Sequence, residues 1–464
     1  MTGTDEHRGM TALERRSAFS LAGIFSLRML GLFMIYPVFS VFALKHLAHA
    51  TPTLVGVALG AYGLTQALFQ IPFGMLSDRI GRKPVIAMGL LLFAAGSLVA
   101  ALSHSIEGVI LGRILQGAGA IGSTVLALAA DLTREEHRTK AMATIGMTIG
   151  FSFALAVVLG PLFDTWIGVP GIFGLTALLA ASGLLVLRFL VPNPVRSRFH
   201  RDTEPVPALF RRVLTDGQLL RLDFGIMALH LILTALFVAL PLALKESAGL
   251  DSRHQWFLYL PVLAAAVVLM VPFIIIAEKR HRMKQVFIGA ILALALAGAL
   301  LMTWHARLLV VAPALVIFFT AFTLMEASLP SLISKMAPPE CKGTAMGVYS
   351  SSQFFGIFIG GAAGGWVQGH YGIDGVFAFV VLVALLWFLL ALSMRQPRYL
   401  NSHLLAIGEM DRAAAERLAG RLSQVPGVAE VAVVAEEGVA YLKVDPQRFD
   451  AAAVQALVPA AESA

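Results

Sequence analysis

Long apolar stretches, separated by short polar segments, fill most of the chain. A helix rises about 1.5 Å per residue, so about 20 apolar residues cross a hydrocarbon core of roughly 30 Å. Because lipid offers no partners to backbone N–H and C=O groups, such stretches cross a membrane as helices. The pattern therefore predicts an all-α polytopic membrane protein with twelve transmembrane helices. The predicted spans are residues 17–44, 53–77, 84–102, 106–130, 139–163, 170–191, 219–244, 254–277, 285–303, 308–333, 343–368 and 374–394.

Near Arg398 the apolar stretches end and a shorter, alternating pattern begins. Val428, Val431 and Val433 are β-branched residues of the kind that strands prefer. The order of the predicted elements, β-α-β-β-α, is that of a small α+β ferredoxin-like domain. These elements are a short strand, a helix over 411–424, a strand over 428–435, a tight turn at Glu437-Gly438, a strand over 439–444 and a helix over 448–459.

The composition agrees with a membrane protein, since 58% of the residues are hydrophobic, 14% are charged and the mean hydropathy is +0.80. Soluble chains are about 25% charged. The charged residues 1–16 contain no small-residue cleavage site, so we expect the first span to be retained. Cys341 is the only cysteine, which excludes a disulfide within the chain and a cysteine-cluster metal site.

Positive charges mark one side of the predicted membrane fold. Lys and Arg gather at the helix ends that share a side with the N-terminus, as at Arg79, Arg82 and Lys83. The opposite ends carry Lys45, Lys245, Arg253 and Arg307. This bias predicts a multi-pass protein with both termini in the cytoplasm. It also accounts for the net charge of +7, so nucleic acid is not an expected partner.

A sequence segment of the first half is repeated in the second half. The residues around Pro72 and Asp78 match those around Pro272 and Glu278, at the end of a predicted span in each case. Repeated halves of apolar helices are typical of secondary transporters. The repeat predicts two pseudo-symmetric six-helix bundles. The predicted domains are residues 14–193 and 218–396 for the bundles, 194–217 for a cytoplasmic linker and 398–464 for the cytoplasmic ferredoxin-like domain.

Residues 74–83, Gly-Met-Leu-Ser-Asp-Arg-Ile-Gly-Arg-Lys, resemble the signature between the second and third helices of the major facilitator superfamily (MFS). Residues 111–120 are similar to the fourth-helix motif of its proton-coupled members. Gly160-Pro161 resembles the signature of its drug:proton antiporter branch, although Ala156 stands where that branch has a glycine. With its tail, the whole chain resembles the YajR-type drug-efflux subgroup, which implies the MFS fold and transport by alternating access.

The charged signature is expected to form a conformational lock. Gly81 allows a tight turn, and the family arrangement implies that Asp78 accepts N–H groups at the start of the eleventh helix, near Gly343. Asp131 is the expected partner of Arg79 or Arg82. In the alternative interpretation these charges only enforce topology. The predicted lock residues are Gly74, Asp78, Arg79, Gly81, Arg82, Lys83 and Asp131.

Ionisable residues inside the predicted spans are sparse: Arg28, Arg113, His230 and Glu326. A charge at the membrane centre costs about 2.5–3.5 kcal/mol on insertion scales, so each is a candidate functional residue. His230 and Glu326 lie at a shared predicted depth, and the first span contains no Asp or Glu. We therefore predict that Glu326 and His230 couple transport to protons. Structural alternatives are a helix brace for Arg28, carbonyl bonding for Arg113 and a satisfied core position for His230.

Amide side chains accompany the buried charges. The predicted substrate cavity comprises Arg28, Arg113, Gln66, Gln70, Gln116 and Gln353. The amides could equally hold helices together. The tail resembles the heavy-metal-associated fold, but its loop at residues 407–411 has no cysteine, so no metal site is expected. A regulatory, ligand-sensing or assembly role for the tail stays open.

These features predict a proton-coupled secondary transporter that exports amphipathic small molecules from the cell across the inner membrane. One alternative is an exporter or importer of a specific metabolite, a sugar or an anionic compound. Another is a membrane-embedded sensor regulated through the tail. No nucleophile–base set or phosphate loop is present, so we expect no enzyme. The expected partners are the lipid bilayer, a small molecule and protons, with the proton gradient instead of a cofactor and a monomeric state.

Overall fold

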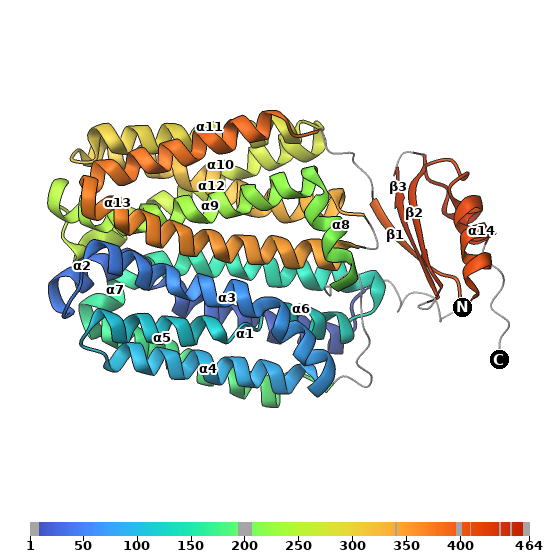
Figure 1. Ribbon diagram of the computed structural model, residues 1–464, viewed down its shortest axis with the longest axis horizontal. Coiled ribbons are helices and arrows are strands. Elements are labelled where there is room, and N and C mark those ends of the chain that lie inside the picture. The colour runs from blue at the N-terminus through green and yellow to red at the C-terminus, as the bar shows by residue number, and fades with distance from the viewer. Residues whose placement is uncertain are drawn as a thin grey trace.

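The computed structural model describes residues 9–193, 207–338, 341–395, 401–408, 410–435, 438–445 and 448–457. Figure 1 shows a bundle of long helices with a small sheet domain beyond one end. We call the bundle end that faces this domain the basic end, because Arg79, Arg82 and Lys83 lie there. The opposite end, where α2 lies, is the distal end. The predicted linker residues 194–206 and the segment 396–400 lie outside the described residues.

The first half of the bundle contains seven helices, of which several begin with a side-chain cap. Thr11 caps the first helix in a capping box with Glu14, and Thr51 and Ser105 cap two others. The helices are α1 (Ala12–Phe33), α2 (Tyr36–His46), α3 (Pro52–Ile80), α4 (Arg82–Leu102), α5 (Ile106–Ala118), α6 (Gly122–Asp131) and α7 (Glu135–Phe189). The first and fourth predicted spans are thus each broken into two helices.

The second half repeats this layout. Asp216 caps the helix that opens its first membrane span. Its elements are η1 (Pro207–Leu209), α8 (Phe210–Thr215), α9 (Gly217–Leu242), η2 (Ala243–Ser247), η3 (Ser252–His254), α10 (Gln255–Lys279), α11 (Met283–Trp304), α12 (Leu308–Met336) and α13 (Lys342–Leu392).

The described chain holds ten helices that are long and apolar enough to cross a membrane. Two of them, α7 and α13, are bent by a glycine with non-helical backbone: Gly168 has φ 65° and Gly372 has φ 69°. Each bend falls between two predicted spans, so each of these helices passes the membrane twice. The described chain therefore contains the twelve predicted spans.

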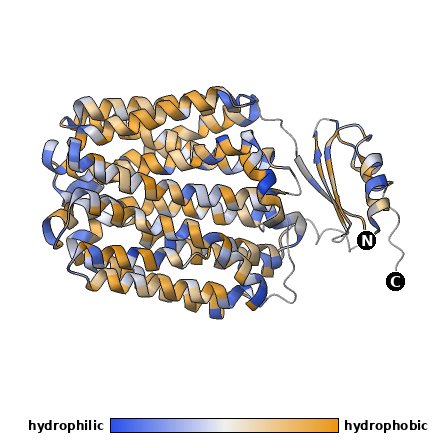
Figure 2. Ribbon diagram, viewed as in Figure 1, coloured by the Kyte–Doolittle hydropathy of each residue, from blue (hydrophilic) through white to orange (hydrophobic). Residues whose placement is uncertain are grey.

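The outside of the bundle is apolar, and the bundle ends are polar (Figure 2). Large hydrophobic side chains such as Phe19, Leu309 and Leu389 are exposed on it, as expected of a surface that faces lipid. Inside, α9 is almost entirely buried, with α13 packed along it. The chain is therefore a multi-pass membrane protein embedded in lipid.

The tail forms a three-stranded sheet in the order β1-β3-β2, antiparallel throughout. The middle strand is the last in sequence, so β1, the first helix and β2 form a split β-α-β unit, as predicted for a ferredoxin-like domain. Gly438, in the predicted turn, has φ +63°, whereas Glu437 lies outside the described residues. The elements are β1 (Asn401–Ala406), α14 (Arg412–Leu422), β2 (Val428–Val434), β3 (Val439–Val444) and α15 (Ala451–Gln455).

Candidate functional site

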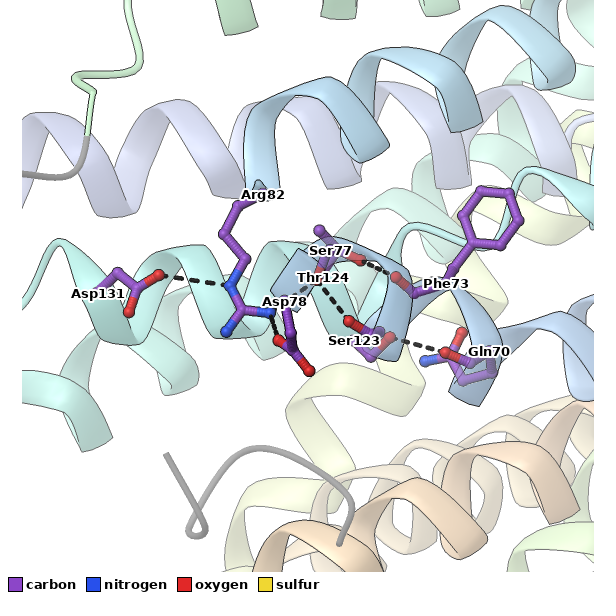
Figure 3. Close-up of polar contacts among 9 residues, drawn as sticks. Gln70, Phe73, Ser77, Asp78, Arg82, Ser123, Thr124 and Asp131 are labelled. Atoms are coloured by element: carbon purple, nitrogen blue, oxygen red, sulfur yellow. Dashed lines mark hydrogen bonds and ion pairs between the residues drawn. The ribbon is translucent and has the colours of Figure 1, made fainter. Parts of the chain in front are cut away.

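The predicted lock residues meet at the basic end of the first half. Gly81 has φ +98°, a backbone conformation that favours glycine, and it turns the chain from α3 into α4. Gly74 lies against α6, where an added Cβ would come within 3.1 Å of the Ser123 hydroxyl. The Ser123 hydroxyl donates to the carbonyl of Gln70 at 2.8 Å (Figure 3). The turn and α6 are therefore held as one unit.

Arg82 is the centre of this unit. Its side chain is 2% exposed and reaches between Asp131 on α6 and Asp78 on α3 (Figure 3). Its Nε lies 3.4 Å from Asp131 Oδ2, and its Nη1 donates to the Ser77 hydroxyl at 2.7 Å and to Asp78. The sequence predicted Arg79 or Arg82 as the partner of Asp131, and in the structure the partner is Arg82. Arg79 is exposed.

The implied contact of Asp78 with the eleventh helix is not formed in this conformation. The Asp78 carboxylate is bonded to Arg82, and within the described part of the chain it does not reach the start of α13. Lys83 instead ties the turn to the end of α7, since its Nζ donates to the Val191 carbonyl at 2.7 Å and to Asn193. All these bonds stay inside the first half.

The second half carries a corresponding ion pair. Its acidic residue lies on α10 and its basic residue on α12, whereas in the first half the basic Arg82 lies on α4 and the acidic Asp131 on α6. Glu278 on α10 is the repeat of Asp78, and it pairs with Lys335 on α12 at 2.9 Å. The carbonyl of Lys335 accepts from the Nζ of Lys443 on β3 at 2.7 Å. Lys443 is 3% exposed and also lies 3.5 Å from Glu430. The tail therefore contacts the Glu278–Lys335 pair of the second half through a buried lysine.

Arg28 lies in the middle of the first half and is 1% exposed. Its Nη2 donates to Gln66 Oε1 at 2.7 Å and to the carbonyl of Gly119 at 2.8 Å, in the break between α5 and α6. Gln66 in turn donates to Gln70 at 2.8 Å. Arg28 thus supplies a donor to backbone that a helix break leaves free. Its Nε and Nη1 have no hydrogen-bond partner among the residues that the structure describes.

Arg113 also lies close to Tyr62: the guanidinium carbons of Arg28 and Arg113 are 5.6 and 5.2 Å from the centre of its ring. Its Nε and Nη2 each donate at 3.2 Å to carbonyls of α3, those of Ala58 and Leu59. Its Nη1 donates to Gln116 at 2.7 Å. Every nitrogen of Arg113 is therefore used to hold helices together, which is the structural role left open by the sequence.

The second half has one polar cluster at the membrane centre: His230 on α9, Glu326 on α12 and Gln353 on α13. The Gln353 Nε2 lies 2.9 Å from His230 Nε2 and 3.3 Å from Glu326 Oε1. His230 Nε2 and Glu326 Oε2 are 3.6 Å apart. His230 Nδ1 lies 3.3 Å from the Ile226 carbonyl. Gln353, predicted for the substrate cavity, thus joins the two residues predicted for proton coupling.

An aromatic layer, which sequence reasoning missed, lies on the distal side of this cluster. It comprises Phe33, Tyr36, Phe153, Phe237, Phe319 and Phe322. Phe153 of the first half contacts Phe319 and Phe322 of the second, at ring-centre distances of 6.2 and 5.5 Å. Phe322 also contacts His230 at 5.8 Å. The layer therefore joins the two halves directly beside the polar cluster.

Glycines bring the halves into backbone contact from the distal end to the middle. A Cβ on Gly56 of α3 would lie 2.1 Å from the Gly361 carbonyl of α13, and Gly60 would meet the Phe358 carbonyl at 2.8 Å. Small residues allow such close approach of membrane helices. A pocket of about 410 Å³ opens at this distal end, lined by both halves. Among the described residues no group of three or more His, Cys, Asp or Glu could hold a metal.

Residues 21–361 match the Major Facilitator Superfamily, and residues 409–459 match the YajR YAM domain. The chain is 47% identical over 436 residues to the inner membrane transport protein YajR of Escherichia coli (strain K12), which covers 94% of this chain and 95% of that protein. It is 26% identical over 353 residues to the multidrug resistance protein MdtH of Proteus mirabilis (strain HI4320), which covers 73% and 83% of the two chains.

Solved transporters share the fold at low sequence identity. The human organic anion transporter MFSD10 aligns over 82% of this chain and 100% of its own, with a TM-score of 0.61 and 22% identity. A D-xylose-proton symporter aligns over 82% and 98%, with a TM-score of 0.63 and 15% identity. At these identities the likeness is one of fold alone.

Proposed function

The chain belongs to the major facilitator superfamily, a family of transporters and not of enzymes, and on that premise we propose that it is a proton-coupled exporter of amphipathic small molecules. It works by alternating access, as a monomer in the cell inner membrane, with its basic end and both termini in the cytoplasm. The proton gradient drives it without a cofactor. The names of two relatives, an inner membrane transport protein and a multidrug resistance protein, support this class of function.

The observation that carries the proposal is the cluster of Glu326, Gln353 and His230. An amide nitrogen has two hydrogens, so Gln353 can donate to both neighbours when His230 is neutral at Nε2 and Glu326 is ionised. The His230 Nδ1 hydrogen then points to the Ile226 carbonyl. The observed bonds therefore fit the pair after it has lost its protons.

The arrangement of the halves supports access from the basic end in this conformation. The aromatic layer and the Gly56–Gly361 contact close the distal side of the cluster. Polar contacts at the basic end run within each half, as for Arg82–Asp131 and Lys335–Glu278. A cluster that has released its protons to the cytoplasm, and now admits substrate from there, is what a proton-driven exporter requires.

The proposed coupling depends on the hydrogen-bond donors and acceptors that His230 and Glu326 offer in their two protonation states. When His230 is protonated at Nε2, this nitrogen can no longer accept from the Gln353 amide, and its N–H faces Glu326 Oε2, 3.6 Å away. The Gln353 amide must then turn. Because α9, α12 and α13 each contribute one group, protonation changes the bonds between three helices of the second half. Alternation between the two bonding patterns is the proposed link between proton binding and helix movement.

A second candidate substrate class is anionic. Among the described residues, two nitrogens of Arg28, Nε and Nη1, have no hydrogen-bond partner, and neither has the hydroxyl of Tyr62, whose ring lies beside the Arg28 guanidinium. The side chains of Arg28 and Tyr62 are buried. A carboxylate that displaced part of this packing would gain charge-assisted hydrogen bonds. This observation favours a specific anionic metabolite as the alternative to broad export.

Transport into liposomes by the purified full-length protein tests both candidates. We expect an acid lumen to drive accumulation of ethidium, an amphipathic cation, and a protonophore to abolish it. Accumulation of carboxyfluorescein in place of ethidium, lost in Arg28→Gln and kept in Arg307→Gln at an exposed arginine, would favour the anionic class. Dye movement that ignores both the pH gradient and the protonophore would contradict proton coupling.

A further inference from the structure

Asp223 is a buried carboxylate that the proposed mechanism leaves unused. The residue lies on α9 and is 5% exposed, and neither of its carboxylate oxygens has a hydrogen-bond partner in the described part of the chain. The start of the helix does not need it, because Asp216 already accepts from the N–H groups of Gln218 and Leu219. No bond among the described residues explains why this carboxylate is buried.

The neighbouring cations are engaged or exposed. Arg221 on the same helix donates to the Ser393 hydroxyl at 2.9 Å and to the Gly217 carbonyl at 2.6 Å. Arg211 and Arg212 on α8, which packs against α9, are exposed to solvent. Burial of an unpaired carboxylate ion costs far more than burial of the neutral acid, so such a group takes up a proton instead.

The position of Asp223 connects it to the central cluster. His230 follows it by two helical turns on the same face of α9, about 10 Å farther from the basic end. Gln353 of α13, the helix packed along α9, contacts His230 at 2.9 Å.

The helices that carry these groups are packed backbone to backbone. A Cβ on Gly356 of α13 would lie 2.2 Å from the Met227 carbonyl of α9, and one on Gly360 would lie 2.3 Å from the Leu231 carbonyl. This contact fixes α9 against α13, so the side chains that flank it keep their relative positions. Asp223 and the central cluster are therefore held by the same closely packed pair of helices, α9 and α13.

We propose that Asp223 is a second proton-binding group of the transporter, placed on α9 between the Glu326–His230 pair and the basic end. This inference rests on the proposed proton coupling. An unpaired, buried carboxyl group favours the neutral acid, so Asp223 holds a proton on the basic side of the central cluster.

Infrared spectroscopy of the full-length protein in lipid membranes tests the proposal without a substrate. At neutral pH the wild type should show the carbonyl-stretch band of a protonated carboxylic acid. Asp223→Asn should lose that band, and Asp223→Glu should keep a shifted one. Asp374→Asn, at an exposed carboxylate of the same half, is the matched control and should leave the spectrum unchanged.

An Asp223→Asn spectrum identical to that of the wild type would overturn the proposal, since Asp223 would then be ionised. A band that is lost as expected, in a protein whose dye transport ignores the pH gradient, would refute proton-coupled export and leave Asp223 as a proton-binding group.

Discussion

Replacement of Gly56 by alanine should open the distal end of the transporter. The new Cβ would lie 2.1 Å from the Gly361 carbonyl and 2.7 Å from the Gly365 Cα, all backbone atoms that cannot rotate away. An ordinary contact of a Cβ with a neighbouring atom begins at 3.4 Å, so α3 and α13 must separate by more than an ångström at this point. Overpacking of this kind costs about 1–3 kcal/mol.

The free-energy cost of this overpacking falls on the distal-closed conformation alone. In alternating access the two halves part at the distal end when the site opens there, so the strain of Gly56→Ala acts on the distal-closed state and is relieved in the other. A difference of about 1–3 kcal/mol shifts the ratio of two states about 5–150-fold. Gly56→Ala should therefore raise the population of distal-open molecules by a factor in this range.

Spin labels across the distal end measure this shift. Lys45 on α2 and Lys245 on η2 line the same distal pocket, so cysteines there, in a Cys341→Ser background, report the gap between the halves. Gly56→Ala should add a population at longer distance in double electron–electron resonance. Gly150→Ala is the control, because a Cβ there meets nothing within 4 Å. A monodisperse Gly56→Ala protein with the distance distribution of that control would refute the reasoning.

Four other predictions concern the basic end and the tail. Asp131→Asn should lower the Tm in scanning fluorimetry more than Asp78→Asn, because the Asp131 carboxylate is 0% exposed and that of Asp78 is 34% exposed. Loss of a partner from a buried ion pair costs about 3–5 kcal/mol, whereas exposed pairs contribute about 0.2–1 kcal/mol. Asp78→Asn should still slow dye transport at normal expression, and an unchanged rate would remove Asp78 from the lock. A chain that ends at residue 397 should keep its membrane topology, as reporter fusions measure, and basal transport. Lys443→Met should release the tail, which limited proteolysis detects as faster cleavage between residues 396 and 400, and equal cleavage would refute the Lys443–Lys335 contact.

Local pattern was sufficient to predict most of the fold. Apolar length alone placed the spans, because a lipid environment demands long helices. The alternating side-chain pattern of the tail predicted two strands whose ends lie within one residue of the ends of β2 and β3. The breaks after Phe33 and Ala118 were not predicted, because both sequences stay apolar there. The second break is stabilised by a donor from a distant helix, Arg28, which no local pattern reveals.

The rare charged residues inside the predicted spans indicated part of the candidate site. A rare carboxylate and a rare histidine at one depth indicated Glu326 and His230, which lie 3.6 Å apart. The bridging position of Gln353 was not predicted, since an amide has no distinctive cost in a membrane helix. The aromatic layer was missed for a related reason. The chain has 30 phenylalanines, and only the packing of α7 against α12 distinguishes Phe153 from those that face lipid.

The most direct test of the central claim is dye transport by Glu326→Gln in liposomes, measured in two modes. Glutamine keeps the size of the side chain and its bond to Gln353 but cannot bind or release a proton. We expect the variant to lose accumulation of ethidium driven by an acid lumen, while exchange of labelled for unlabelled dye at equal pH continues near the wild-type rate. A variant that still concentrates the dye against its gradient would contradict the assignment of proton coupling to Glu326.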